Sequence, residues 1–180
     1  MNKRNGVKIA FCGISTALSL VILLMTIIPI TEISLAALAG IVLIPAVIEF
    51  GRKYGLIVYA VVSLLALLLI PTLEGKALYI AFFGYYPVLK SALEARRLPR
   101  VAEWTIKLAV FNAAVVVAYL LMLHVFGLPK DSFTIGGVSL PWVFLPLGNG
   151  VFFAYDRCLT GLVSKYMRAW QPRVRRLFKF

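Results

Sequence analysis

The chain alternates long apolar runs with short polar connections along its whole length. Each apolar run holds about 17–25 residues, which is enough for a helix to cross a hydrocarbon core of roughly 30 Å. The pattern therefore predicts an all-α polytopic membrane protein, a single domain over residues 1–180. Its six transmembrane helices are expected at residues 7–28, 33–50, 54–70, 77–93, 102–126 and 141–165. The connections are short, so we expect consecutive helices to pack antiparallel.

Prolines and a glycine mark irregular places within three of these spans. Pro45 is expected to kink or break the second helix, because proline removes a backbone donor and clashes with the preceding turn. Gly84 and Pro87 interrupt the fourth helix, and Pro146 is expected to kink the sixth. The longest loop lies between the fifth and sixth helices, and a basic tail follows the sixth.

Composition agrees with a membrane protein and disfavours a nucleic-acid-binding one. Of the 180 residues, 62% are hydrophobic and only 14% are charged, a balance that water-soluble domains do not show. Lys and Arg number 19 against 7 Asp and Glu. This basic excess falls between apolar spans, where charge reports membrane topology rather than a nucleic-acid partner.

The basic residues between the spans gather on one side of the predicted membrane. Positive residues mark the cytoplasmic face, so both termini are expected inside the cell. Only Lys76 and Lys130 are expected on the outer side. The inner-side set is Lys3, Arg4, Lys8, Arg52, Lys53, Arg96, Arg97, Arg100, Lys165, Arg168, Arg173, Arg175, Arg176 and Lys179.

Polar and aromatic residues form a stripe on each of the last three predicted spans. Burying a polar side chain in hydrocarbon is costly, so we expect each of these residues to have a hydrogen-bond partner or a functional role. Helical spacing places the members of each set on one face. The sets are Tyr79, Phe83, Tyr86 and Lys90 on the fourth span; Asn112 and Tyr119 on the fifth; and Trp142, Asn149, Phe153 and Asp156 on the sixth.

If the three stripes converge, they build an aromatic-walled cavity open to the outer side. We expect it to bind a small molecule, with its wall made by Tyr79, Tyr86, Tyr119, Trp142 and Asn149. Lys90 and Asp156 lie at similar depths and could pair to close the floor, near Asn112. The alternatives are a snorkelling Lys90, an interfacial pair of Asp156 with Arg157, and asparagines that bond between helices without any ligand.

The sequence holds no constellation for catalysis. It lacks GxxxxGK[ST], HExxH and GxSxG, and its single histidine, His124, has no second histidine with which to share a metal. We therefore expect no enzyme, no cofactor and no metal. A small binder, a passive pore and a subunit of a larger assembly remain.

Two stretches carry a resemblance to a known family: the small-residue first span, KIAFCGISTALSLVILL, and LAGIVLIPAVIEFGRKYGLIVYAVVSLLALLLIP, two spans joined by a tight turn. The chain resembles the substrate-binding S components of energy-coupling factor (ECF) transporters. The resemblance implies a bacterial plasma-membrane protein that binds a vitamin or other micronutrient from outside. It also implies partners, namely a transmembrane coupling subunit and two ABC-type ATPases that supply the energy in trans. The family's AxxxA docking motif matches Gly13 and Ala17, and Ala10 precedes them on the same helix.

Two other classes of function fit parts of the pattern. A non-catalytic scaffold of the cell-shape machinery, similar to the rod-shape protein MreD, would also be small and helical. It would not need three polar-aromatic stripes that converge on one cavity. A small enzyme acting on lipid is disfavoured because no catalytic group is paired.

Overall fold

The protein is almost entirely helical in the computed structural model, which describes residues 3–28, 30–96, 98–124, 134–135 and 138–178. The α-helices are α1 (Lys3–Leu24), α2 (Glu32–Ile41), α3 (Ile44–Phe50), α4 (Arg52–Leu69), α5 (Leu73–Leu78), α6 (Tyr86–Ala95), α7 (Arg100–His124), α8 (Leu140–Lys165) and α9 (Gln171–Phe178). A 3-10 turn over Met25–Ile27 extends α1, and π-helical turns cover Tyr79–Phe83 and Tyr166–Trp170. Strands β1 (Thr134–Ile135) and β2 (Val138–Ser139) form a short antiparallel hairpin in the predicted longest loop.

Several helices have the length and apolarity of membrane spans. Within the described residues four stretches qualify: Asn5–Ile27, Glu32–Phe50, Arg52–Leu69 and Arg100–Leu120. Large apolar side chains cover their outward surfaces; for example, Leu68 is 75% exposed and Ile14 is 63% exposed. Such a surface suits lipid and not water. The predicted all-α class is confirmed, and these four described stretches, long and apolar enough to cross a membrane, agree with the predicted membrane setting.

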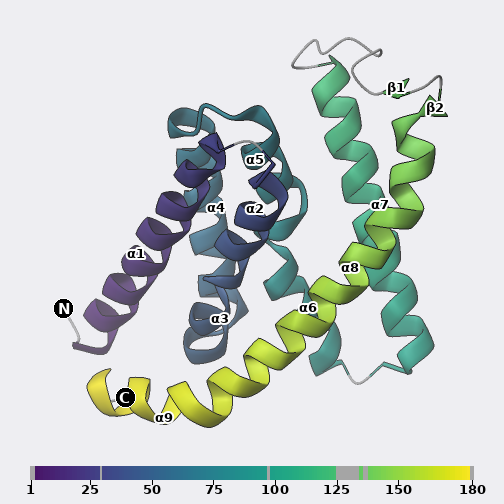
Figure 1. Cartoon of the computed structure of the whole chain (residues 1–180). Coiled ribbons are helices and arrows are strands. Elements are labelled where there is room, and N and C mark those ends of the chain that lie inside the picture. The colour runs from purple at the N-terminus through teal and green to yellow at the C-terminus, as the bar shows by residue number, and fades with distance from the viewer. Residues whose placement is uncertain (1–2, 29, 97, 125–133, 136–137, 179–180) are drawn as a thin grey trace.

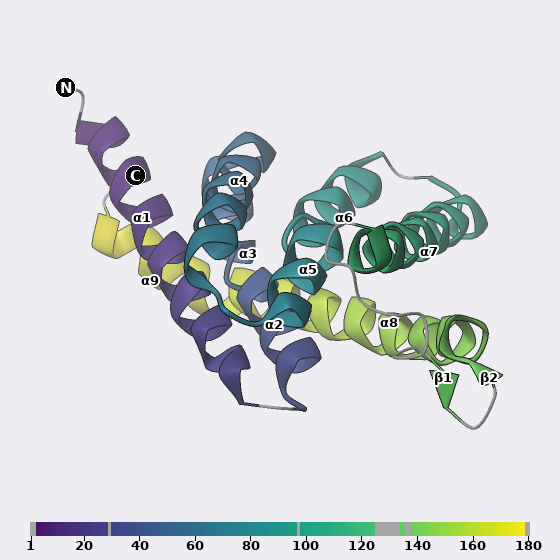
Figure 2. The same cartoon turned by 90° about the horizontal axis from the view of Figure 1, so that it is seen from above.

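The helices form two groups joined by a central element (Figure 1). α1, α2, α3 and α4 lie together on one side, while α7 and α8 form a pair on the other. α5, the π-helical turn Tyr79–Phe83 and α6 connect the two groups, as the view from above also shows (Figure 2). α1 packs against α2 and α4, and α7 packs against α8 and the π-helical turn.

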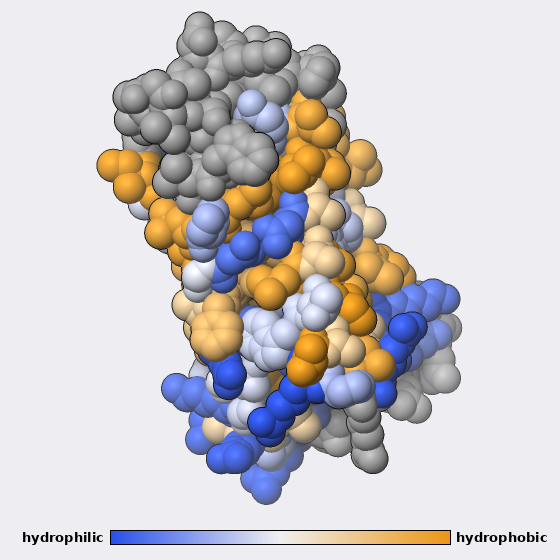
Figure 3. All heavy atoms as spheres, turned by 90° about the vertical axis from the view of Figure 1, so that its right-hand side faces the viewer, coloured by the Kyte–Doolittle hydropathy of each residue, from blue (hydrophilic) through white to orange (hydrophobic). Residues whose placement is uncertain are grey.

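The two ends of the molecule differ in chemistry. We call the end that holds the starts of α1, α4 and α7 and the end of α8 the basic end; Arg52, Lys53, Arg100 and Lys165 lie there. The opposite end, which carries β1 and β2, is the hairpin end. Figure 3 shows hydrophilic residues gathered at the basic end and hydrophobic residues above them.

The proline and glycine positions break the second and fourth predicted spans. The second span is α2 and α3, separated by a turn at Val42 and Leu43 just before Pro45, as predicted. The fourth span begins at Leu73, earlier than the predicted residue 77, and turns at Gly84 and Tyr85 before α6, where an interruption was predicted. Pro146 lies inside α8, which continues past it.

Two glycines are required by the backbone path. Gly51 has a φ of 90° in the tight turn between α3 and α4, a conformation that glycine adopts at little cost. At Gly40 an added Cβ would collide with the carbonyl of Phe83, so α2 and the π-helical turn approach each other backbone to backbone. Ser19 Oγ donates to Ala39 O at 3.0 Å and ties α1 to the same part of α2.

The basic tail is helical, which the sequence pattern had not indicated. α8 ends at Lys165, the π-helical turn Tyr166–Trp170 follows, and α9 continues the chain. In Figure 1 this segment crosses the basic end and leads back toward the N-terminus. The C-terminal segment is therefore an ordered element of the basic end.

Candidate functional site between α6, α7 and α8

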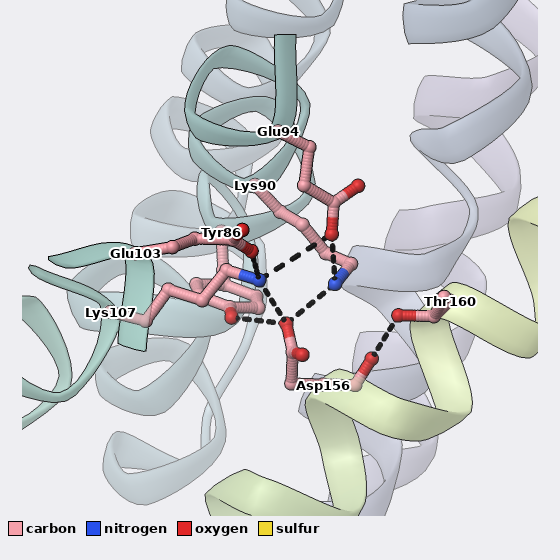
Figure 4. A network of polar contacts seen from close by, with 7 residues as sticks. All are labelled: Tyr86, Lys90, Glu94, Glu103, Lys107, Asp156 and Thr160. Atoms are coloured by element: carbon pink, nitrogen blue, oxygen red, sulfur yellow. Dashed lines mark hydrogen bonds and ion pairs between the residues drawn. The ribbon is translucent and has the colours of Figure 1, made fainter. Parts of the chain in front are cut away.

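A buried acid, Asp156 of α8, lies at the centre of a polar network (Figure 4). Its Oδ1 accepts a hydrogen bond from Tyr86 Oη at 2.6 Å and from Lys90 Nζ at 2.7 Å, both from α6. Asp156 is 2% exposed and Lys90 is 4% exposed. The pairing of Lys90 with Asp156, which their similar depth suggested, is present, and Lys90 does not snorkel.

A second buried cation, Lys107 of α7, completes the network. Its Nζ lies 3.2 Å from Asp156 Oδ1 and 2.5 Å from Glu103 Oε1, and Lys107 is 1% exposed. Glu94 of α6 joins both lysines, at 2.5 Å from Lys90 Nζ and 3.4 Å from Lys107 Nζ. Three helices are thus joined through charged side chains.

The network balances two ammonium groups against three carboxylates. Taking charges out of water is expensive, and pairing with hydrogen bonds offsets the cost. Glu94 keeps a side chain that is 42% exposed, so the excess negative charge is placed where solvent can reach it. A polar cavity of about 270 Å³ borders the network, and Arg100, Trp104 and Arg157 stand at its edge. This arrangement fixes the relative positions of α6, α7 and α8 near the basic end.

An aromatic cluster packs on the hairpin side of the network. We use this name for Phe82, Phe83, Tyr86, Phe111, Phe152 and Tyr155. Phe111 and Phe152 stack with their centroids 4.8 Å apart and their planes at 11°, which joins α7 to α8. Phe82 contacts Phe111 at 5.0 Å and Tyr86 at 4.7 Å, so the cluster joins the fourth span to both helices. Rings at these separations contribute beyond their buried area.

Several buried oxygens around the cluster lack a hydrogen-bond partner. Among the described residues these include the hydroxyls of Tyr79 and Tyr155 and the amide oxygens of Asn112 and Asn149. The Asn112 amide nitrogen donates to Leu108 O at 2.9 Å, on its own helix. A buried acceptor without a partner costs about 1–3 kcal/mol, so each of these oxygens is a place for a water or a ligand group.

The predicted wall residues have different surroundings. Tyr79 and Tyr86 are both 0% exposed and packed against other rings, so neither lines an open cavity in this structure. Tyr119 is half-buried on α7, and Asn149 is half-buried on α8. The side chain of Trp142 lies outside the described residues. Tyr86 instead belongs with Lys90 and Asp156, as a donor to the network.

The predicted stripe on the sixth span is partly wrong. Phe153, which the stripe includes, is 49% exposed and stacks on Trp104 with centroids 5.0 Å apart. The buried face of α8 instead includes Phe152, Asp156 and Leu159, at offsets of 0, 4 and 7. Asp156 lies on both stripes, and its burial agrees with the pairing hypothesis rather than with the interfacial alternative.

The predicted docking residues share an exposed face of α1. Ala10, Gly13 and Ala17 are all exposed, and an added Cβ at Gly13 would meet nothing within 4 Å. Larger side chains on this face would therefore not disturb the packing of the chain itself. The face is free for lipid or for a partner helix.

Sequence reasoning missed Lys107, Glu94 and Glu103 as members of the network. A signal was present, because Glu94 follows Lys90 by four residues and Glu103 precedes Lys107 by four, a spacing that favours ion pairs on helices. The Phe82, Phe111 and Phe152 contacts were missed because pairing between helices does not show in the spacing along one helix.

Comparison with known proteins adds no relative. The chain matches no protein-family model, no curated protein and no solved structure.

Proposed function

We propose that this protein is the substrate-binding membrane subunit of an ECF-type importer. It takes a vitamin-like small molecule from the outer side of a bacterial plasma membrane. In this proposal the chain spans the membrane six times with both termini in the cytoplasm, so the basic end is the cytoplasmic end. The protein itself performs no catalysis, since a coupling subunit and two ABC-type ATPases supply the energy.

One observation carries the proposal: the unpartnered oxygens of Asn112, Asn149, Tyr79 and Tyr155 beside the aromatic cluster. In a membrane interior no bulk water can satisfy them, so leaving them unpaired is costly. A bound molecule with hydrogen-bond donors and an apolar face would satisfy the oxygens and contact the rings. The ion network closes the same helices on the cytoplasmic side of this position.

The docking face of α1 provides the test. Gly13→Leu with Ala17→Leu leaves ligand binding intact and removes association with the ATPases, because bulky side chains prevent close approach of a partner helix. The measurement is affinity purification from native membranes, with ABC-type ATPases identified and ligand quantified by mass spectrometry. Leu68→Trp on α4 is the matched control, since Leu68 is 75% exposed on a different face. ATPases that remain with the double variant contradict the docking role.

A second candidate is a non-catalytic scaffold similar to MreD. The close packing of Tyr79 and Tyr86 favours it, because a scaffold needs a rigid interior and no cavity. Under this alternative no small molecule accompanies the purified protein and no ATPase associates with it. The same purification therefore separates the two functions.

A further inference from the structure

An apolar groove opens near the basic end, where α8 passes the break between α2 and α3. Its volume is about 260 Å³. The walls are apolar and come from both sides of the break and from the last turn of α8: Ile41, Ile44, Pro45 and Leu162. The turn at Val42 and Leu43, which separates α2 from α3, lies between the wall residues Ile41 and Ile44.

The mouth of the groove is basic and aromatic. Lys165 and Trp170 line it, and both are exposed, Trp170 by 57%. Tyr166 lies between them and donates from Oη to Glu49 Oε1 at 3.4 Å, which holds the π-helical turn against α3. Lysine and tryptophan with an apolar stem and a polar tip are the residues found where a membrane meets water.

The segment after the groove extends the positive charge. Arg168, Arg173 and Arg176 are exposed on the π-helical turn and on α9. The sequence from Lys165 to Phe180 contains no Asp or Glu. Glu49 contacts the mouth through Tyr166, whose hydroxyl donates a hydrogen bond to the Glu49 carboxylate. The basic surface formed by the mouth and the segment after it therefore attracts anions.

We propose that the groove binds an acyl chain of an anionic phospholipid, whose phosphate is held at the mouth by Lys165 and Arg168. The groove is lined by Lys165 and Trp170 as well as by apolar residues of α2 and α3, so a lipid placed there would have its headgroup at the basic residues and its chain against the apolar ones. The groove is smaller than most pockets that enclose an entire small-molecule ligand, and a space of this size can hold one part of a lipid. A docked peptide would need partners for its backbone polar groups, and four apolar walls do not provide them.

A lipid bound in this groove would hold the C-terminal segment at the surface of the membrane. The headgroup bridges the end of α8 and the π-helical turn, which Tyr166 already ties to α3. This inference does not depend on the cargo proposed above or on any partner protein.

Native mass spectrometry of the full chain in detergent tests the proposal, with phosphatidylglycerol and phosphatidylcholine of identical chains as probes. Wild type retains phosphatidylglycerol at least about fivefold more than phosphatidylcholine. Lys165→Gln with Arg168→Gln lowers phosphatidylglycerol to the phosphatidylcholine level. Leu162→Trp, which fills the groove, reduces phosphatidylglycerol by a similar factor while the charges remain. Glycerophosphoglycerol, which has no chains, does not displace the lipid.

Arg52→Gln with Lys53→Gln is the matched control, because it removes two exposed charges at the basic end from residues that do not line the groove. It leaves retention of phosphatidylglycerol unchanged. Equal loss in both charge variants, equal retention of the two lipids by wild type, or displacement by the headgroup alone would each overturn the proposal. Far-UV circular dichroism shows which variants fold, and the two charge variants decide the matter if Leu162→Trp does not.

Discussion

Lys90 Nζ and Asp156 Oδ1 lie 2.7 Å apart in a site where both side chains are almost fully buried. They are 66 residues apart in sequence and come from α6 and α8. Asp156 also accepts from Tyr86 and faces Lys107 of α7, so one carboxylate holds three helices together. Loss of the Asp156 carboxylate is therefore expected to affect the packing of α6, α7 and α8 near the basic end.

Asp156→Asn is expected to destabilise the protein strongly. Removing one partner of a buried ion pair costs about 3–5 kcal/mol when the remaining charge is left uncompensated. Here Lys90 and Lys107 lose their buried partner but keep Glu94 and Glu103, so we expect a loss near the lower end of this range. Glu94→Gln is the control and is expected to cost less than Asp156→Asn, since the Glu94 side chain is 42% exposed and solvent screens its contacts with the two lysines. Thermal unfolding in detergent measures both, and equal losses would argue against a central role for Asp156.

The pair also predicts coupling between two substitutions. Lys90→Met combined with Asp156→Asn is expected to cost less than the sum of the single changes, by about 0.5–3 kcal/mol, because neither leaves the other unpaired. Glu103 still neutralises Lys107 in this double variant. Chemical denaturation of the four proteins gives the coupling energy. Additive effects would show that the contact contributes nothing of its own.

Gly40 predicts a contrast between two glycine substitutions. Gly40→Ala places a Cβ against the Phe83 carbonyl and is expected to cost about 1–3 kcal/mol through overpacking. Gly161→Ala on α8 meets nothing within 4 Å and is expected to be neutral or to stabilise by up to about 1 kcal/mol through helix propensity. The difference in melting temperature between the two variants checks this. Identical behaviour would mean that α2 and the π-helical turn can separate at no cost.

Asn149→Leu separates folding from binding. Its amide oxygen is buried without a partner, so replacing it with an apolar group of similar size is expected to leave the ligand-free protein as stable as wild type, or more stable by about 1 kcal/mol. The same change removes a group proposed to contact the ligand. Melting temperature and co-purifying ligand are measured on one preparation. A large loss of stability would mean that Asn149 has a structural partner instead.

The sequence predicted the helical class and the break at Pro45, because apolar run length and proline are local properties. It offered the pairing of Lys90 with Asp156 only as one of several possibilities. It predicted an interruption of the fourth span at Gly84 and Pro87 but not the close approach of Gly40 to Phe83, which joins residues 43 positions apart in the chain. Helical spacing alone placed Phe153, and not Phe152, on the polar-aromatic stripe. Only the packing of Phe111 from another helix distinguishes the two faces.

The C-terminal helix α9 is a second feature that the sequence pattern did not predict. The positive charge of the residues after Lys165 predicted that this tail lies at one side of a membrane. Its helical path across the basic end depends on the π-helical turn and on the contact of Tyr166 with Glu49, 117 residues away. Contacts of that range follow from the packed fold and not from the composition of the tail.

Mass spectrometry of the small molecules that accompany the protein through purification in detergent separates cargo binding from a scaffold role. We predict one small organic molecule in near-equal amount with wild type, and much less with Asn149→Leu at unchanged stability. A wild-type preparation that carries no small molecule, from cells supplied with a full set of vitamins, would contradict a cargo-binding role and favour the scaffold.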